Sequence, residues 1–314
     1  GVNAVQFMPL GEFEGNDSWG YNPSFFFALD KYYGTKDKLK ELIDSCHKNG
    51  MAVILDVVYN HAFGQNPMVQ MYFDPNTGEF GQPTPDNPWL NPIATHPFSV
   101  GYDFNHEAPA TRQFFKDVME FWLTEYRFDG FRFDLSKGFT QVNTGSNVGA
   151  WNQYDQSRVN IIFDYVNHCR SVANDPYMIL EHLGNWDEEV VFANAGMMVW
   201  AKGSNQYYEA AMGWLNGNNQ NLYHTTPNHR GWNNYGMVQY AESHDEERLM
   251  YKNLNFGNST GDYNTRNLAT ALERMSLVAC FLIPLPGPKM LWQFGEVGYD
   301  LSINRCPNGT ISED

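Results

Sequence analysis

Short apolar runs alternate along the chain with stretches in which apolar residues recur every three or four positions. Apolar runs of this kind predict buried strands, and the longer spacing predicts helices that are apolar on one face. The expected strands cover residues 2–8, 51–58, 128–135, 177–180, 197–201, 236–241 and 289–294. One expected helix begins near residue 36, and three others cover residues 111–126, 205–215 and 267–281.

The order of these segments predicts the fold class. Strands that are separated by helices form parallel sheets with right-handed crossovers. The expected strands number one fewer than the strands of a closed barrel. We therefore predict an α/β protein with the (β/α)8 TIM barrel fold, truncated before the first strand and after the eighth. One barrel domain is expected over residues 1–314.

The segment 62–107 breaks this alternation. It is rich in Pro, Gly and Asn, and it is too long for a simple connection, so we predict an inserted loop after strand 3. His96 and His106 lie in this loop and are expected at the surface. The chain opens at Gly1 directly on a strand and has no methionine there, so flanking domains and any targeting segment are expected outside it.

Composition narrows the classes of partner. The net charge of −16 argues against nucleic acid and anionic membranes. No apolar run is long enough to insert into a membrane. The aromatic fraction is 16%, and exposed aromatic rings stack on the CH faces of sugars, so a neutral polysaccharide remains a suitable partner. Cys46 and Cys280 lie on apolar helix faces and are expected to be buried free thiols.

Acidic residues and histidines recur where the expected strands end. Asp56 lies in the second expected strand, Asp134 and Glu181 close the third and fourth, and His244 and Asp245 follow the sixth. A single acidic residue at such a position is more often a helix cap. Several at one end of a sheet converge in space, and clustered carboxylates are kept where they are used.

Glycoside hydrolysis is the chemistry that needs such a set without a Ser or Cys nucleophile. One carboxylate attacks, a protonated one serves as general acid, and a third stabilises the developing positive charge. A divalent metal site is the competing interpretation, since carboxylates also bind Mg²⁺ or Ca²⁺. Arg132 weighs against it, because a guanidinium near Asp134 would repel a cation and keep that carboxylate ionised.

Four segments together resemble, in order and spacing, the signature segments of the α-amylase superfamily, glycoside hydrolase family thirteen. They are DVVYNH at 56–61, GFRFD at 130–134, ILE at 179–181 and SHD at 243–245. Residues 1–9, 103–105 and 287–296 are similar to its second strand, its short motif late in the inserted loop, and its eighth strand. The resemblance covers essentially the whole chain and implies a barrel whose loop 62–107 is a short domain B.

The resemblance implies roles for the three carboxylates. Asp134 would be the nucleophile that forms a glycosyl-enzyme intermediate, Glu181 the general acid and base, and Asp245 the residue that grips the sugar hydroxyls. The mechanism would be retaining, so the carboxyl groups of Asp134 and Glu181 should lie roughly 5–5.5 Å apart.

Other positions are implied to contact the substrate or to support the site. Asp56 is similar to the structural aspartate that supports Arg132, and Trp186 is the candidate platform for sugar on the acceptor side. The expected substrate-binding residues are Tyr21, which would stack under a sugar, and His61, Arg132, Lys137, His244 and Trp186.

The subtype signals are mixed. Lys137 is kept, but Gly138 stands where many α-amylases have a histidine whose carbonyl helps to bind calcium. The segment 133–135 resembles pullulanases, and 243–246 resembles glycogen branching enzymes. Asn60 is a calcium ligand in many amylases, so calcium is a candidate ligand, but no cofactor is expected to be required.

The leading hypothesis is a retaining glycosidase that cleaves α-1,4 or α-1,6 bonds of starch- or glycogen-type α-glucans. The alternative is a 1,4-α-glucan branching enzyme, in which a sugar hydroxyl replaces water. More remote alternatives are a non-catalytic glucan-binding barrel and a metal-dependent hydrolase. An extracellular or periplasmic location would suit the hydrolase, and a cytoplasmic one the branching enzyme.

Overall fold

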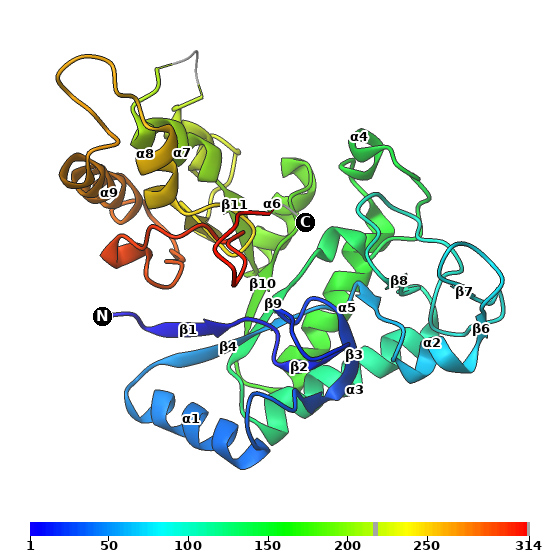
Figure 1. The fold of residues 1–314 in the computed structure, drawn as a ribbon. Helices are drawn as coiled ribbons and strands as arrows, with labels where there is room; N and C mark the ends of the chain where they lie inside the picture. Colours follow the sequence, from blue (N-terminus) through cyan, green and yellow to red (C-terminus); the bar gives the residue numbers. More distant parts are fainter. Residues whose placement is uncertain (216–218, 313–314) are drawn as a thin grey trace. The chain divides into compact units, whose positions relative to one another are not determined.

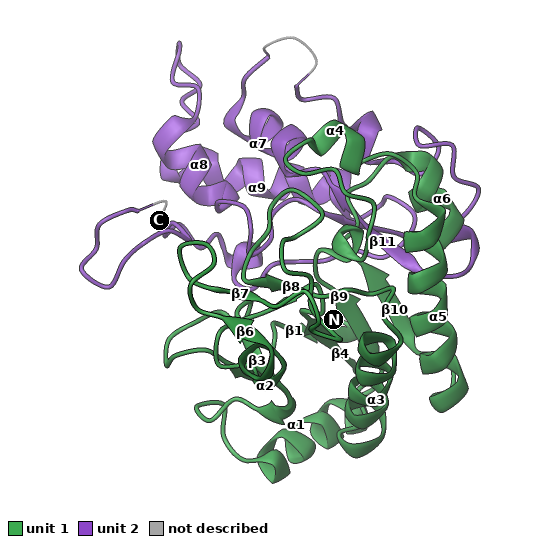
Figure 2. Cartoon of the chain, turned by 90° about the vertical axis from the view of Figure 1, so that its right-hand side faces the viewer, with its two compact units in different colours: residues 1–192 green, residues 193–314 purple. Residues whose placement is uncertain are grey.

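The computed structural model describes residues 1–215 and 219–312. They fall into two compact units, Gly1–Phe192 and Ala193–Asp314, which Figure 2 colours separately. Each unit contains parallel strands joined by helices (Figure 1), as the alternation of apolar runs predicts. The organisation as a single domain stays a prediction. Among the described residues, no helix is both long and apolar enough to cross a membrane.

The first unit is built on four parallel strands, which are adjacent in the order β1, β4, β9, β10. These are β1 (Ala4–Phe7), β4 (Ala52–Val57), β9 (Gly130–Phe133) and β10 (Tyr177–Leu180), all within predicted strand segments. Val57 pairs with Phe133, and Phe133 with Leu180, so three strands end at one level. The residues that follow them therefore emerge side by side.

Helices connect these strands. The longer ones are α1 (Lys36–Lys48), α3 (Pro109–Glu125) and α5 (Gln156–Val172), and the shorter ones are α2 (Pro67–Met71), α4 (Val148–Trp151) and α6 (Trp186–Asn194). Thr35 caps α1, whose buried face includes Cys46 as predicted. The sequence pattern did not single out α5, although Asp155 caps it by accepting two backbone N–H bonds. It packs against α3.

The predicted inserted loop carries the short helix α2 and short strands. β5 (His61–Ala62) pairs with β8 (Tyr102–Asp103), which holds the two ends of the loop together, and β6 (Phe73–Asp74) pairs with β7 (Gln82–Pro83). A separate hairpin of β2 (Gly11–Phe13) and β3 (Pro23–Leu29) precedes α1. Phe26, Phe104 and Phe115 form an edge-to-face cluster that joins this hairpin to the loop and to α3.

The second unit contains a parallel pair, β11 (Met198–Lys202) and β12 (Met237–Tyr240). Its helices are α7 (Ser204–Met212), α8 (Leu249–Phe256) and α9 (Leu268–Leu282). Cys280 is exposed on α9, contrary to prediction, because the buried face of that helix runs through Ala271, Val278 and Leu282.

The expected strand at 289–294 is wrong. Only Lys289 bridges to Gln239 in parallel, and a 3-10 helix follows at Gly295–Val297. Phe294 has a left-handed backbone (φ 66°), which turns the chain out of the extended conformation. The apolar run therefore forms a single bridge and then a turn.

Candidate active site

Three neighbouring strands bring three carboxylates to one edge of the sheet in the first unit. Asp56 pairs in register with Arg132 inside the sheet. Asp134 follows β9 directly, and its N–H donates to the carbonyl of Val57 at 2.9 Å. Glu181 follows β10, and its N–H donates to the carbonyl of Phe133 at 3.0 Å. The parallel ladder therefore continues into the site and fixes the backbone of both Asp134 and Glu181.

Arg132 lies at the centre of this cluster. Its Nη1 lies 2.8 Å from an oxygen of Asp56 and 2.8 Å from an oxygen of Asp134, and its Nη2 lies 3.2 Å from Oε2 of Glu181. The Arg132 side chain is fully buried, whereas those of Asp134 and Glu181 keep 13% and 12% of their surface exposed. Asp134 and Glu181 are thus accessible to a ligand, and Asp56 supports them from beneath.

Three carboxylates share this one guanidinium, and the pKa values of Asp56 and Asp134 are shifted from their usual range. Burial raises the pKa of Asp56 to about 6, against the opposing effect of Arg132. Burial likewise raises the pKa of Asp134 well above its usual range; Arg132 opposes the shift, and the charges of Glu181 and Asp56 add to it. The effect of Arg132 on the pKa of Asp134 is therefore opposed by burial and by the two neighbouring acids, and the ionised state of Asp134 stays a prediction.

A strained residue contributes to the site and was missed in the sequence. Leu135 follows Asp134 with left-handed backbone angles (φ 45°, ψ 40°), and its N–H donates to Oε2 of Glu181 at 2.9 Å. This conformation costs an apolar residue about 1 kcal/mol or more and is found where the surroundings enforce it. The turn after Asp134 is therefore shaped to reach the carboxylate of Glu181.

Tyr21 and His61 lie beside this cluster. The hydroxyl of Tyr21 donates to Asp56 at 2.9 Å, and Nε2 of His61 lies 2.9 Å from the carbonyl oxygen of Tyr21. Burial lowers the pKa of His61, so its ring is neutral and can donate from Nε2 to that carbonyl. His61 thus positions Tyr21; contact of either residue with a sugar stays a prediction.

Lys137, expected to bind substrate, is buried and engaged by the protein. Its ammonium donates to Asn152 at 2.6 Å and to the carbonyl of Leu183 at 2.7 Å, and it lies over the ring of Trp151 at 4.1 Å. Burial and the charge of Arg158 lower its pKa to about 8. These contacts hold the loop that follows Glu181, so substrate binding by Lys137 stays a prediction.

Gly138 shows why a histidine would not fit at this position. A Cβ at Gly138 would lie 1.8 Å from Oδ1 of Asn60 and 2.9 Å from Nε2 of His96. The Asn60 oxygen is buried and has no hydrogen-bond partner among the described residues. The oxygens of nearby Asp103 are already bonded to His96 and Asn91.

One available amide oxygen does not match the six to eight oxygen ligands of calcium. No group of three or more His, Cys, Asp or Glu residues in the described part of the chain could hold a metal. Calcium binding at Asn60 stays a prediction, and no step below uses it.

Two further histidines correct the sequence analysis. His96 and His106 are buried rather than at the surface, because the inserted loop folds back over the core. His106 bonds to the Tyr165 hydroxyl at 2.8 Å and to the carbonyl of Tyr59 at 2.9 Å, and burial lowers its pKa to about 3. The two histidines lie in a polar loop without a regular apolar pattern, so the sequence gave no sign that they are buried.

The remaining predicted residues follow other elements. Trp186 begins α6 in the first unit and is 41% exposed. His244 and Asp245 belong to the second unit and follow β12. There His244 is buried between the rings of Trp200 and Trp292, and its Nε2 lies 3.3 Å from the half-exposed carboxylate of Asp245. The convergence of Asp245 with Asp134 and Glu181 stays a prediction.

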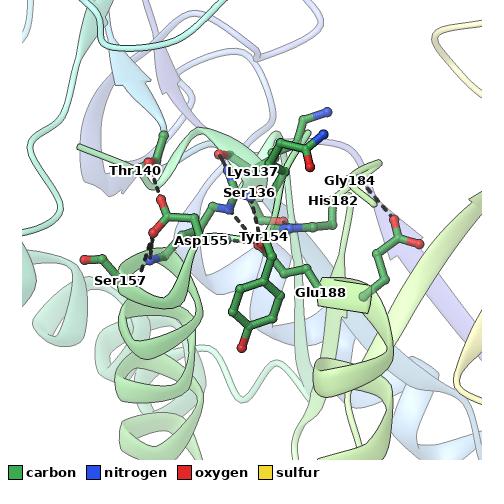
Figure 3. A network of polar contacts seen from close by, with 12 residues as sticks. Ser136, Lys137, Thr140, Tyr154, Asp155, Ser157, His182, Gly184 and Glu188 are labelled. Atoms are coloured by element: carbon green, nitrogen blue, oxygen red, sulfur yellow. Dashed lines mark hydrogen bonds and ion pairs between the residues drawn. The ribbon is translucent and has the colours of Figure 1, made fainter. Parts of the chain in front are cut away.

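A second buried charged group in the first unit was not found in the sequence (Figure 3). Glu188 accepts from Arg158 at 2.6 and 2.8 Å and contacts His182 at 2.8 Å, and all three side chains are buried. The run DEE at 187–189 suggested only an acidic first helical turn. The partners come from α5 and from the loop after β10, which no local pattern links.

Known proteins that are similar to this chain belong to the group that its signature segments resemble. Residues 1–79 match the family "Alpha amylase, catalytic domain". A 1,4-alpha-glucan branching enzyme of Halothermothrix orenii is 26% identical over 97% of the chain and 48% of its own length. The pullulanase of Bacillus subtilis is 35% identical over 46% of the chain and 21% of its own length. The chain thus spans less than half the length of these relatives.

Solved structures show the same fold. Eubacterium rectale Amy13B superposes with a TM-score of 0.70 at 21% identity, over 96% of this chain and 60% of that one. A cyclomaltodextrinase gives a TM-score of 0.71 at 20% identity, over all of this chain and 50% of that one. The predicted TIM-barrel fold class is confirmed. Together with the ordered signature segments, these likenesses agree with a resemblance to the α-amylase superfamily, glycoside hydrolase family thirteen, whose catalytic-domain family matches residues 1–79.

Proposed function

We propose that the chain cleaves glycosidic bonds of α-glucans by double displacement with retention of configuration. The observation that carries the proposal is the arrangement of Asp134 and Glu181, which end adjacent strands, remain partly exposed and both contact Arg132. Two carboxylates held at neighbouring positions are what a retaining glycosidase requires. The printed names of the relatives, a pullulanase and branching enzymes, support the α-glucan as the substrate class.

In the first step, a carboxylate oxygen of Asp134 bonds to the anomeric carbon while the bond to the leaving oxygen breaks. Glu181 gives its proton to that oxygen. In the second step, Glu181 takes a proton from water, and the oxygen of that water displaces Asp134 from the anomeric carbon. The proton balance closes, because Glu181 ends each cycle protonated and Asp134 ends it ionised.

The acids around Arg132 influence one another. Burial raises the pKa of Asp56 to about 6 and that of Asp134 above its usual range, and Arg132 opposes both shifts. In the proposed cycle Asp134 attacks as the ionised form, and the negative charge of the cluster would stabilise the positive charge that develops on the sugar ring. Asp245 and His244 would hold sugar hydroxyls, and Trp186 would stack on the acceptor.

A glucan branching enzyme is the second candidate, and a specific observation favours it. The alignment with the branching enzyme of Halothermothrix orenii covers 97% of this chain, and the segment SHDE at 243–246 resembles that group. The first step is shared, and a sugar hydroxyl replaces water in the second. Incubation with amylose separates the two: hydrolysis creates reducing ends, and branching lowers iodine colour without creating them.

The proposed chemistry is tested on Asp134 and Glu181 separately. Product analysis on amylose, pullulan and glycogen identifies the bond, and NMR of the fresh product shows whether the α configuration is kept. On a substrate with a good leaving group, azide should convert the glycosyl-enzyme of Glu181→Ala into an α-glycosyl azide, because azide needs no general base, whereas in Asp134→Ala azide would attack the anomeric carbon directly and give the inverted β-glycosyl azide. Glucan binding with no turnover of any of the three polymers would instead support a non-catalytic barrel.

A further inference from the structure

The buried group around Glu188 has no place in the double displacement itself. Arg158 and Glu188 are each at most 1% exposed, so no substrate reaches them. Their bidentate pair is completed by the N–H of Asp155, which donates to Oε2 of Glu188 at 2.7 Å. A buried ion pair with this many hydrogen bonds is costly to assemble and gives little net stability over apolar packing. Its connection to other residues therefore suggests what it does.

That connection leads to Glu181. His182, the next residue, places Nε2 2.8 Å from Oε1 of Glu188 and Nδ1 3.0 Å from the hydroxyl of Ser136. The Ser136 hydroxyl and backbone N–H each lie 3.0 Å from the carbonyl oxygen of Glu181. Figure 3 shows Ser136, His182 and Glu188 in this sequence of contacts.

The protons in this chain of contacts can be assigned. Hydrogen bonds from His182 and Arg158 outweigh the effect of burial on Glu188, and its pKa falls to about 2, so it is ionised. Burial lowers the pKa of His182, so its ring is neutral near pH 7. The neutral ring donates from Nε2 to Glu188 and accepts at Nδ1 from the Ser136 hydroxyl. The N–H of Ser136 is then directed at the carbonyl of Glu181.

Ser136 also lies in the turn that delivers the N–H of Leu135 to the carboxylate of Glu181. The turn thus contacts Glu181 twice, once at the carbonyl and once at the side chain. Because Leu135 is held in a left-handed conformation, the turn needs an anchor beyond its own preferences. The Ser136 hydroxyl, through His182 and Glu188, supplies it.

We propose that Ser136 and His182, anchored by the Glu188–Arg158 pair, are positioning residues that set the geometry of Glu181 for proton transfer. This inference rests on the proposed function, since it assigns the acid to Glu181. It concerns residues that touch no substrate and that act through the turn 134–136. A general acid contributes only when it is within hydrogen-bond reach of the leaving oxygen, so small displacements are costly.

Leaving-group chemistry separates positioning from general damage. Maltosyl fluoride loses fluoride with little need for a proton, whereas a malto-oligosaccharide needs protonation of its leaving oxygen. We expect Ser136→Ala and His182→Gln to lower kcat/KM on the oligosaccharide at least about tenfold more than on the fluoride. His182→Asn is the matched comparison. The amide of the shorter side chain occupies the position of Nδ1, so the variant keeps the hydrogen bond with Ser136 but loses the hydrogen bond to Glu188.

Because His182→Asn keeps the contact with Ser136 but loses the anchor at Glu188, it should lose thermal stability and change the ratio between the two substrates less than His182→Gln does, though not leave it unchanged. Equal losses on both substrates in Ser136→Ala and His182→Gln would overturn the inference and leave the proposed function intact. An unsubstituted protein that turns over neither substrate would instead refute the proposed function.

A second measurement needs no turnover. Amide hydrogen exchange at Leu135 should accelerate in His182→Gln and not in Asp44→Asn, which changes an exposed carboxylate on α1. Unchanged exchange at Leu135 would overturn the anchoring role whatever the activity.

Discussion

Two fully buried arginines in the same unit hold their carboxylates in opposite ways. Arg132 faces three acidic side chains, from Asp56, Asp134 and Glu181. Arg158 faces one, Glu188, and spends its other donors on backbone carbonyls. The pKa of Asp56 is raised to about 6 in the first cluster, because burial outweighs Arg132, while that of Glu188 falls to about 2.

The difference shows what each cluster is suited to. A carboxylate that shares its guanidinium with no other acid, and that accepts further hydrogen bonds, stays ionised and rigid. Such a group is suited to holding neighbouring residues in place. Three carboxylates that share one guanidinium outnumber the positive charge beside them, and such a surplus of acids suits the stabilisation of a cation on the substrate. Activity should therefore depend most on the Arg132 cluster, and folding stability most on the Arg158 cluster.

The largest effect is expected for Asp134→Asn. It removes the proposed nucleophile, so kcat on amylose should fall by about 10³-fold or more. The free energy of unfolding in urea should stay the same or rise, because one of three competing acids is replaced by a neutral group. A variant that keeps most of its activity would contradict the assignment; Asp44→Asn serves as the control.

Glu188→Gln should show the reverse order of effects. It leaves the buried charge of Arg158 uncompensated, which lowers the free energy of unfolding by about 3–5 kcal/mol. Its kcat should fall far less than that of Asp134→Asn, because Glu188 reaches Glu181 only through His182 and Ser136. Urea denaturation and steady-state kinetics on the same preparations give both numbers. Unchanged stability would show that the two clusters do not differ as described.

The two clusters should also respond to pH with opposite signs. The pKa of Glu188 is lowered from 4.5 to about 2, so its contribution of about 3 kcal/mol is present above pH 4.5 and lost as pH falls towards 2. The pKa of Asp56 is raised from 3.8 to about 6, so its contribution is present below pH 3.8 and lost as pH rises through 6.

Thermal unfolding followed across pH tests these signs. Glu188→Gln should flatten the loss of Tm on the acid side, and Asp56→Asn should flatten the decline of Tm between pH 4 and 6. A variant that alters the other pH window instead would contradict the assigned pKa shifts.

The smallest effect is expected for Lys137→Met. Loss of the bond from its ammonium to the carbonyl of Leu183 should loosen the loop after Glu181 and lower kcat about tenfold at nearly constant KM. The opposite split, a raised KM with kcat unchanged, would restore Lys137 to the substrate-binding residues.

Much of the first cluster could be read from the sequence. Asp134 and Glu181 each close an apolar run, and parallel strands align their carboxyl ends, so their meeting follows from local pattern and sheet register. The prediction of the last strand was wrong because the same apolar pattern is compatible with an extended strand and with a single bridge followed by a turn. The left-handed backbone of Phe294 decides for the turn. Burial of His96 and His106 likewise depended on how the inserted loop folds.

By itself, the sequence determined the alternation of strands and helices, the resemblance to a family, and which carboxylates end the strands. Only the tertiary structure decided that three acids compete for Arg132, that Lys137 is held by Leu183 and Trp151, and that Glu188 is joined to Glu181. The reason is physical: strand order follows from periodic patterns along the chain. Ionisation and hydrogen-bond partners depend on burial and on neighbours that are distant in sequence.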